Sequence, residues 1–175
     1  MIMRTFISID LPKEVKEEIK KIQDRLPDFI GKKTELDNLH LTLKFFGEID
    51  KREVDEVKEK LREIKFKSFE TEIDSIGVFS EKFIRIVWLH LKNCDGLQRE
   101  VDNKLKDLLS EERRFMSHLT IARVKAIKER GEFLKKLKEI KISPIKFKVN
   151  NYKLKKSTLT PDGPIYETIE EYSLD

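Results

Sequence analysis

Two short segments of this sequence repeat each other, and they constrain the fold more than any other feature. The first runs Asn38-Leu-His-Leu-Thr-Leu-Lys-Phe-Phe-Gly47 and the second Ser117-His-Leu-Thr-Ile-Ala-Arg-Val124. Both read His-Leu-Thr-aliphatic within an alternating run typical of a β-strand, so that His and Thr project from one face. The chain has only three histidines, and two of them, His40 and His118, occupy equivalent positions. This pair is the candidate centre of the molecule.

The rest of the chain predicts a strand-helix-strand-helix-strand order that occurs twice and is followed by one terminal strand. Alternating apolar residues indicate strands, and apolar stripes at spacings of three and four indicate helices. Asp50 and Glu53 are spaced as a capping box before the second helix. The expected strands are about 4–9, 38–46, 68–79, 83–91, 115–124, 144–155 and 165–173, the expected helices about 12–26, 54–64, 97–108 and 127–140, and residues 28–37 a charged connection.

We therefore predict an α+β fold in one domain, residues 1–175, built from pseudo-repeats at about 1–80 and 81–175. A chain of this length can bury one compact core. Each half carries its histidine on the middle strand. A duplicated unit with a pseudo-two-fold axis would place the two middle strands on either side of a cleft. His40 and His118 could then act on one substrate.

Composition narrows the class of protein. Charged residues make up 40% of the chain, with a net charge of +4 and a pI near 9.0. This surface is compatible with a polyanionic partner such as RNA, and is equally expected of a heat-adapted protein. The single cysteine, Cys94, excludes an internal disulfide. No apolar run approaches the length of a membrane span, and the N-terminus alternates as a strand rather than resembling a signal peptide, so we expect a cytoplasmic protein.

The repeated residues suit phosphodiester chemistry. Imidazole has an ordinary pKa near 6.5, so two of them facing one site can serve as base and acid. Thr42 and Thr120 could hydrogen-bond the phosphate oxygens, and Arg123 offers a guanidinium matched to phosphate. A metal site is the weaker alternative, because two histidines without nearby carboxylates are an incomplete ligand set. The third histidine, His90, lies between two leucines and is expected to be structural.

The chain resembles the 2H phosphoesterase superfamily, which is defined by two His-x-Thr-x motifs. It is most similar to the RNA 2′,3′-cyclic phosphodiesterase branch, also called 2′-5′ RNA ligases. The matching segments are 4–10, 38–48, 118–124 and 156–167. The resemblance implies a bilobal α+β fold whose antiparallel sheets line a central groove with the helices outside. It also implies hydrolysis of RNA 2′,3′-cyclic phosphate ends to 2′-phosphates, in some members with reversible 2′-5′ ligation.

The resemblance also implies roles for individual residues. His118 would accept a proton from water, His40 would donate one to the departing 3′-oxygen, and Thr42 and Thr120 would hold phosphate oxygens. The acid and base assignments could be reversed in so symmetric a site. No metal and no cofactor are expected.

Two further family positions conflict with strict alternation. Arg123 would contact phosphate and Phe45 would stack on the terminal base, yet both fall on the face opposite the histidines. Each role requires a bend in its strand, and a core position is the alternative for Phe45. Lys44 has the parity of His40 and is a candidate phosphate contact. The tail residues Ser157, Gly163 and Tyr166 match the family but are expected to shape a turn outside the site.

Two other functions are also compatible with the sequence. One is a phosphodiesterase for a small cyclic nucleotide, and the other is an RNA-end-binding module with little turnover. The expected partner is RNA with a 2′,3′-cyclic phosphate end, tRNA fragments among them, and the expected state is a monomer without membrane contact.

Overall fold

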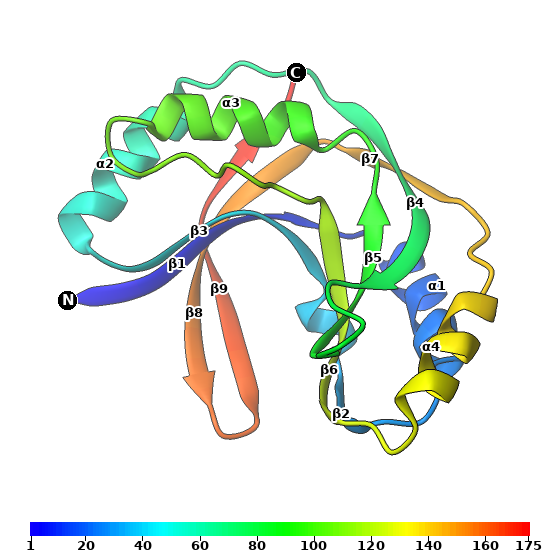
Figure 1. Cartoon of the computed structure of the whole chain (residues 1–175). Coiled ribbons are helices and arrows are strands. Elements are labelled where there is room, and N and C mark those ends of the chain that lie inside the picture. Colours follow the sequence, from blue (N-terminus) through cyan, green and yellow to red (C-terminus); the bar gives the residue numbers. More distant parts are fainter.

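A computed structural model describes all 175 residues and has four α-helices and two antiparallel sheets (Figure 1). The strands of the first sheet, in order, are β3 (His40–Asp50), β1 (Ile2–Asp10), β8 (Asn151–Thr160) and β9 (Gly163–Ser173). Those of the second are β2 (Ile30–Lys33), β6 (His118–Ala126), β5 (Ile86–Leu91), β4 (Phe69–Val78) and β7 (Ile145–Val149). The predicted α+β fold with antiparallel sheets is confirmed.

Neither sheet belongs to one half of the sequence. In the first sheet the histidine strand β3 pairs with β1, and β1 pairs with β8 from the second half. In the second sheet the histidine strand β6 pairs with β5, and β5 pairs with β4 from the first half. In both sheets the histidine strand is followed by the first strand of its own half and then by a strand of the other half. Backbone hydrogen bonds within each sheet therefore join the two halves.

The helices lie on the outer faces of the sheets (Figure 1). Helices α2 (Lys51–Arg62) and α3 (Asp95–Leu105) contact β3, whereas α1 (Lys13–Asp24) contacts β6 and β7 and α4 (Arg130–Glu139) contacts β4. Each helix buries an apolar stripe, as in Val54, Val57 and Leu61 of α2. The predicted capping box is confirmed, because the Asp50 side chain accepts from Glu53 N while the Glu53 side chain accepts from Asp50 N. One continuous cluster of 33 buried apolar residues fills the core.

The structure differs from the sequence prediction at three connections. The charged connection 28–37 contains β2, whose four residues are exposed, and the short 3-10 helix η1 (Leu36–Asn38). The predicted strand 144–155 is two strands, β7 and β8, which join different sheets. Helix α4 begins at Arg130 rather than near residue 127. Periodicity alone does not detect a short exposed strand such as β2, which has no alternation of apolar residues. It also does not show which sheet a strand joins.

None of the helices is long and apolar enough to cross a membrane.

Candidate active site

The two motif histidines are the first residues of β3 and β6, and both are oriented in the same way. His40 Nδ1 lies 2.8 Å from Asn38 O, and His118 Nδ1 lies 2.9 Å from Met116 O. A carbonyl oxygen can only accept, so each Nδ1 carries a proton and donates it. The neutral form of each ring therefore keeps an unprotonated Nε2, the atom that can take or, once charged, give a proton.

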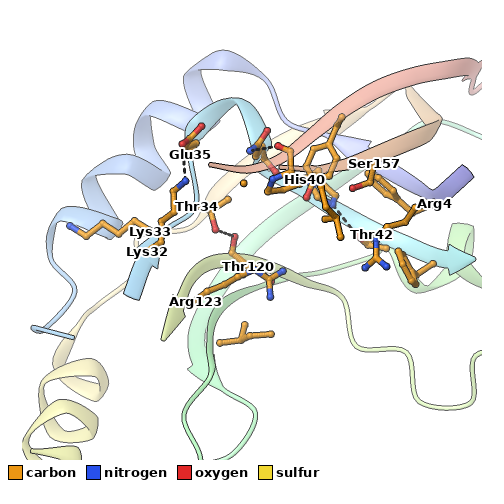
Figure 2. A pocket seen from close by; sticks show the side chains of 18 of the residues that line it. Arg4, Lys32, Lys33, Thr34, Glu35, His40, Thr42, Thr120, Arg123 and Ser157 are labelled. Atoms are coloured by element: carbon orange, nitrogen blue, oxygen red, sulfur yellow. Dashed lines mark hydrogen bonds and ion pairs between the residues drawn. The ribbon is translucent and has the colours of Figure 1, made fainter. Parts of the chain in front are cut away.

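His40 is held on several sides. Its Nε2 lies 3.0 Å from Thr42 Oγ1, so the threonine hydroxyl can donate to the neutral ring (Figure 2). The rings of Phe6 and Tyr166 pack on it, with centroids 5.1 Å and 5.0 Å from the imidazole. His118 has one aromatic neighbour, Phe79, in an edge-to-face contact at 4.9 Å. These contacts fix the directions in which the two imidazoles point.

Burial lowers the pKa of His40 to about 4. The hydrogen bond to Asn38 O raises the pKa, but the positive charges of Lys155 and Arg123 lower it further, and Asp10 opposes them. Asp10 is itself bonded to two ammonium groups, Lys153 and Lys155, which hold the pKa of its carboxyl low although burial raises it. In the free protein His40 is therefore neutral at pH 7.

Both histidines open onto one cavity of about 650 Å³. The cavity is lined by both motifs and takes residues from both sheets, including β1, β8 and β9 of the first and β2, β5 and β6 of the second. The motif residues that line it are His40, Thr42, Phe45, His118, Thr120 and Arg123. The structure thus brings together all six site residues named from the sequence. Their chemical roles remain predictions.

Two equivalent β-bulges explain how Phe45 and Arg123 reach this cavity. Thr42 pairs with Ser8 and Lys44 with Ile7, so Leu43 has no partner on β1. Likewise Ile121 has no partner on β5, between the pairs of Thr120 and Ala122. An extra residue in a strand reverses the side-chain alternation beyond it.

The reversal has opposite consequences for two neighbouring residues of β3. Phe45 turns into the cavity and is 50% exposed, with the Arg4 guanidinium 4.5 Å above its ring. A core position for Phe45 is therefore wrong. Lys44 turns into the interior, pairs with Asp102 of α3 and donates to Ser110 O. The prediction that Lys44 is a phosphate contact is also wrong, because the parity argument holds only up to the bulge.

Polar contacts beside the cavity hold the bulge of β6. Gln23 of α1 is buried, and its Nε2 donates to Ile121 O and to Thr34 O, each at 2.9 Å. Thr34 N also donates to Ile121 O, and Thr34 Oγ1 donates to Thr120 O at 2.9 Å (Figure 2). The carbonyl oxygens of Thr120 and Ile121, at the bulge, therefore have hydrogen-bond partners, as buried polar groups require.

The cavity wall is rich in positive charge. Arg123 pairs across the strands with Lys32, and Lys33 and Arg4 also line the wall. Lys32 Nζ makes an ion pair with Glu35 at 3.0 Å and donates to Asp162 O in the β8–β9 turn at 2.8 Å. The sequence alone does not identify Arg4 and Lys32 as site residues, because β2 has no strand pattern and the sequence does not show which residues lie across from the motifs.

Three tail residues also belong to the cavity. Ser157, Gly163 and Tyr166 all line it, and Tyr166 packs on His40. The prediction that they lie outside the site is wrong, although Gly163, with φ +124°, does form the turn as expected. The feature of the sequence that could have placed these three residues in the site is their match to the family pattern.

His90 lies outside this lining, and its Nδ1 is 2.7 Å from the carboxylate of Asp74. Cys94 is buried and unpaired, as a lone cysteine requires. The structure has no group of three or more His, Cys, Asp or Glu residues that could hold a metal ion.

Comparison with known proteins gives a consistent result. The family model described as LigT like Phosphoesterase matches residues 9–88 and 92–166. A protein of Methanocaldococcus jannaschii named RNA 2′,3′-cyclic phosphodiesterase is 37% identical over 97% of this chain and 100% of its own length. A protein of the same name from Thermotoga maritima is 38% identical over 97% of this chain and 94% of its own length.

Solved structures share the fold. A crystal structure of a Thermus thermophilus protein superposes with a TM-score of 0.82 at 25% identity, covering 98% of this chain and 97% of that one. The structure of Escherichia coli LigT complexed with 3′-AMP has a TM-score of 0.80 at 23% identity and covers 99% of both chains. From the family model and these relatives we conclude that the chain belongs to the LigT-like phosphoesterase family.

Proposed function

We propose that this protein is an enzyme that hydrolyses RNA 2′,3′-cyclic phosphate ends to 2′-phosphates by acid–base catalysis between two histidines. Relatives that match nearly the whole chain carry the name RNA 2′,3′-cyclic phosphodiesterase. The observation that carries the mechanism is the equivalent orientation of His40 and His118, each with Nδ1 bonded to a carbonyl and both lining one cavity.

In the proposed reaction a water oxygen attacks phosphorus while His118 Nε2 takes its proton. The bond from phosphorus to the 3′-oxygen breaks, and His40 Nε2 gives a proton to that oxygen. The product is a 2′-phosphomonoester with a free 3′-hydroxyl. Each proton transfer is worth about 10²- to 10⁴-fold in rate. If the 5′-hydroxyl of another RNA replaces water, the same steps form a 2′-5′ linkage.

The remaining residues would bind the charged group. The hydroxyls of Thr42 and Thr120 can donate to non-bridging oxygens, and Arg123 can pair with the anion. Phe45 would stack on the terminal base, because its exposed ring lies in the same cavity.

The low pKa of His40 bears on this assignment. A donor must carry a proton on Nε2, which burial opposes in the free protein. A phosphodiester anion beside the ring favours the charged form and offsets the neighbouring Lys155 and Arg123. We therefore propose that substrate binding raises the pKa of His40 and charges it for its role as acid.

The deciding experiment is hydrolysis of a short RNA with a 2′,3′-cyclic phosphate end, with EDTA present, by wild type, His40→Ala and His118→Ala. Release of a 2′-phosphate that falls at least about 100-fold in both variants is expected. Lys141→Ala, which changes an exposed lysine outside the cavity lining, is the control. Tight binding of this RNA without turnover by wild type would instead favour an RNA-end-binding module.

We further propose that the protein acts as a monomer in the cytoplasm, on ends such as those of tRNA fragments. Gel filtration at micromolar concentration tests the monomer, and a mass above one chain would contradict it.

A further inference from the structure

We propose that the loop between β4 and β5, residues 79–85, forms a second nucleobase site that takes the base preceding the cyclic phosphate nucleotide. The proposal rests on the proposed function and narrows its substrate to RNA of at least two nucleotides. The loop carries Phe79, Lys82, Phe83 and Arg85, and all four side chains are exposed. None of the four lines the cavity already described.

Phe79 offers a fixed aromatic surface beside a motif histidine. Its ring meets the His118 imidazole edge to face, with centroids 4.9 Å apart at 86°. On another side it packs on Trp88 of β5, at 5.9 Å between centroids. Even so, 54% of Phe79 remains exposed. A ring that packs on two neighbours and still presents half its surface is suited to stacking on a base.

A glycine makes this arrangement fit. A Cβ atom at Gly77 would lie 2.7 Å from the ring of Trp88, so the indole occupies space that only glycine leaves open. Trp88 Nε1 is buried without a hydrogen-bond partner, an unfavourable arrangement that the packing must offset. The ring of Phe79 is therefore supported by the closely packed residues Gly77 and Trp88, and its exposed face is held in place.

The rest of the loop adds positive charge, which attracts the phosphates of RNA. Phe83 is 70% exposed, and its backbone N–H donates to Ser80 Oγ at 3.2 Å. The only acidic residue in the loop, Glu81, makes an ion pair with Lys138 at 3.1 Å. Lys82 and Arg85 take part in no ion pair, and the one side-chain hydrogen bond of Arg85 is a long one of 3.5 Å from Nη1 to Lys125 O. Exposed aromatic rings interleaved with free cations are the combination by which proteins bind single-stranded nucleic acid.

Two aromatic surfaces in different sheets require two bases. Phe45 belongs to the first sheet and is proposed to stack on the terminal base, whereas Phe79 extends from the second sheet and touches His118. A mononucleotide has one base and can occupy one of these surfaces. The second surface is available to the neighbouring nucleotide, while Lys82 and Arg85 offer charge to the connecting phosphate.

The test compares kcat/KM for three substrates that each end in a 2′,3′-cyclic phosphate. They are a mononucleotide, a dinucleotide, and a dinucleotide whose first nucleotide lacks its base. The enzymes are wild type, Phe79→Leu and Phe83→Leu, since leucine keeps apolar packing but loses the aromatic face. Ile2→Ala is the matched control, because Ile2 is a 68% exposed apolar residue at the start of β1.

We expect wild type to prefer the full dinucleotide over the other two substrates by about tenfold or more. The ratio of dinucleotide to mononucleotide should fall about tenfold in Phe79→Leu, fall less in Phe83→Leu, and stay constant in Ile2→Ala. A wild-type ratio near one would overturn the proposal. So would an equal loss on both substrates in Phe79→Leu, which would reduce Phe79 to packing against His118.

These results are distinct from failure of the proposed function, which would appear as no hydrolysis of any substrate by wild type. In that case the binding affinities of the 2′-phosphorylated dinucleotide and mononucleotide are compared instead. Tighter binding of the dinucleotide supports the second site, and equal binding contradicts it.

Discussion

Lys44 and Asp102 form a buried ion pair that joins the strand of the first motif to helix α3. Lys44 Nζ also donates to Ser110 O at 2.8 Å, and Asp102 accepts from Glu112 N at 2.8 Å. Ser110 and Glu112 belong to the loop that leads to His118. A residue of the first motif thus helps to anchor the segment that enters the second.

Breaking this pair should destabilise the protein strongly. Lys44→Met leaves the Asp102 carboxylate buried without its cation, and we expect a loss of about 3–5 kcal/mol in the free energy of unfolding. Lys44→Met/Asp102→Leu removes both charges and should lose much less, because no unpaired charge remains. Urea denaturation measures both values. A double variant as unstable as Lys44→Met would show that packing, and not the unpaired charge, dominates.

The sequence predicted most elements because their apolar periodicity is strong, and it predicted the histidine pair because the motif is repeated. It could not predict the bulges at Leu43 and Ile121, since a bulge depends on which residue of the neighbouring strand takes each hydrogen bond. The same limit applied to β2, which has no apolar pattern and pairs with β6 through its backbone. Residue alternation therefore places Lys44 on the wrong face and cannot decide between the core and the cavity for Phe45.

The titration of His40 provides a second prediction. Burial lowers its pKa to about 4 in the folded protein, against about 6.5 in an unfolded chain. As pH falls, His40 therefore takes up a proton in the unfolded state before it does so in the folded state. This uptake lowers the free energy of unfolding. The loss begins near pH 6.5, grows as pH falls to about 4, and is absent above that range. The slope is at most about 1.4 kcal/mol per pH unit.

Two measurements check this behaviour. NMR of the imidazole carbons should give a pKa near 4 for His40 in the free protein and a higher value with a bound phosphodiester. Urea denaturation between pH 4 and 7 should show a flatter pH dependence for His40→Gln than for wild type. Equal slopes for the two proteins would contradict the lowered pKa.

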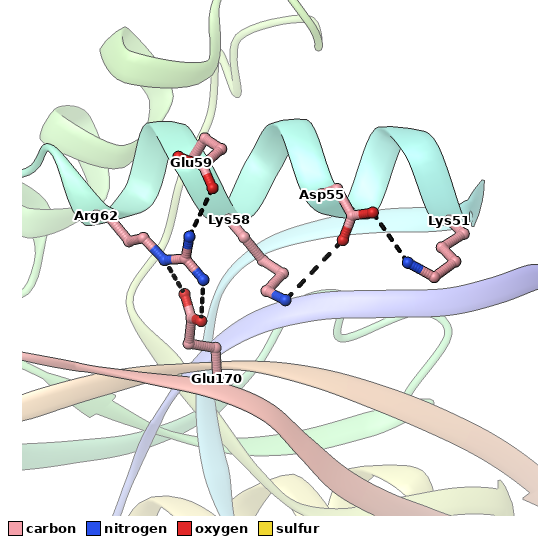
Figure 3. A network of polar contacts seen from close by, with 6 residues as sticks. All are labelled: Lys51, Asp55, Lys58, Glu59, Arg62 and Glu170. Atoms are coloured by element: carbon pink, nitrogen blue, oxygen red, sulfur yellow. Dashed lines mark hydrogen bonds and ion pairs between the residues drawn. The ribbon is translucent and has the colours of Figure 1, made fainter.

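A surface network linking α2 to β9 gives a third prediction (Figure 3). Arg62 donates to both carboxylate oxygens of Glu170, at 3.0 Å and 2.6 Å, and to Glu59 at 2.6 Å. Bidentate pairs within networks are the exposed ion pairs that contribute to stability, and their value grows with temperature. We expect a melting temperature above about 60 °C for wild type.

Glu170→Gln should lower this melting temperature, because it removes the charge that joins the helix to the sheet. Lys51→Gln, which affects one i,i+4 pair with Asp55 on the same helix, should lower it less. Differential scanning calorimetry at low salt and in 1 M NaCl provides the check, since the Debye length at 1 M is about 3 Å. If the melting temperature of Glu170→Gln stays below that of wild type in 1 M NaCl, the cause is lost packing and not lost charge.

The division of labour between the two histidines can be tested by changing the leaving group. A thiolate is a far weaker base than an alkoxide. In a substrate with sulfur in place of the 3′-oxygen, the sulfur can therefore leave phosphorus without a proton from an acid. If His40 is the acid, the loss caused by His40→Ala should shrink about 10²-fold or more on the sulfur substrate. The loss caused by His118→Ala should stay the same, because water still requires a base. The reverse pattern would exchange the two roles, and it would agree with the neutral state that burial imposes on His40 in the free protein.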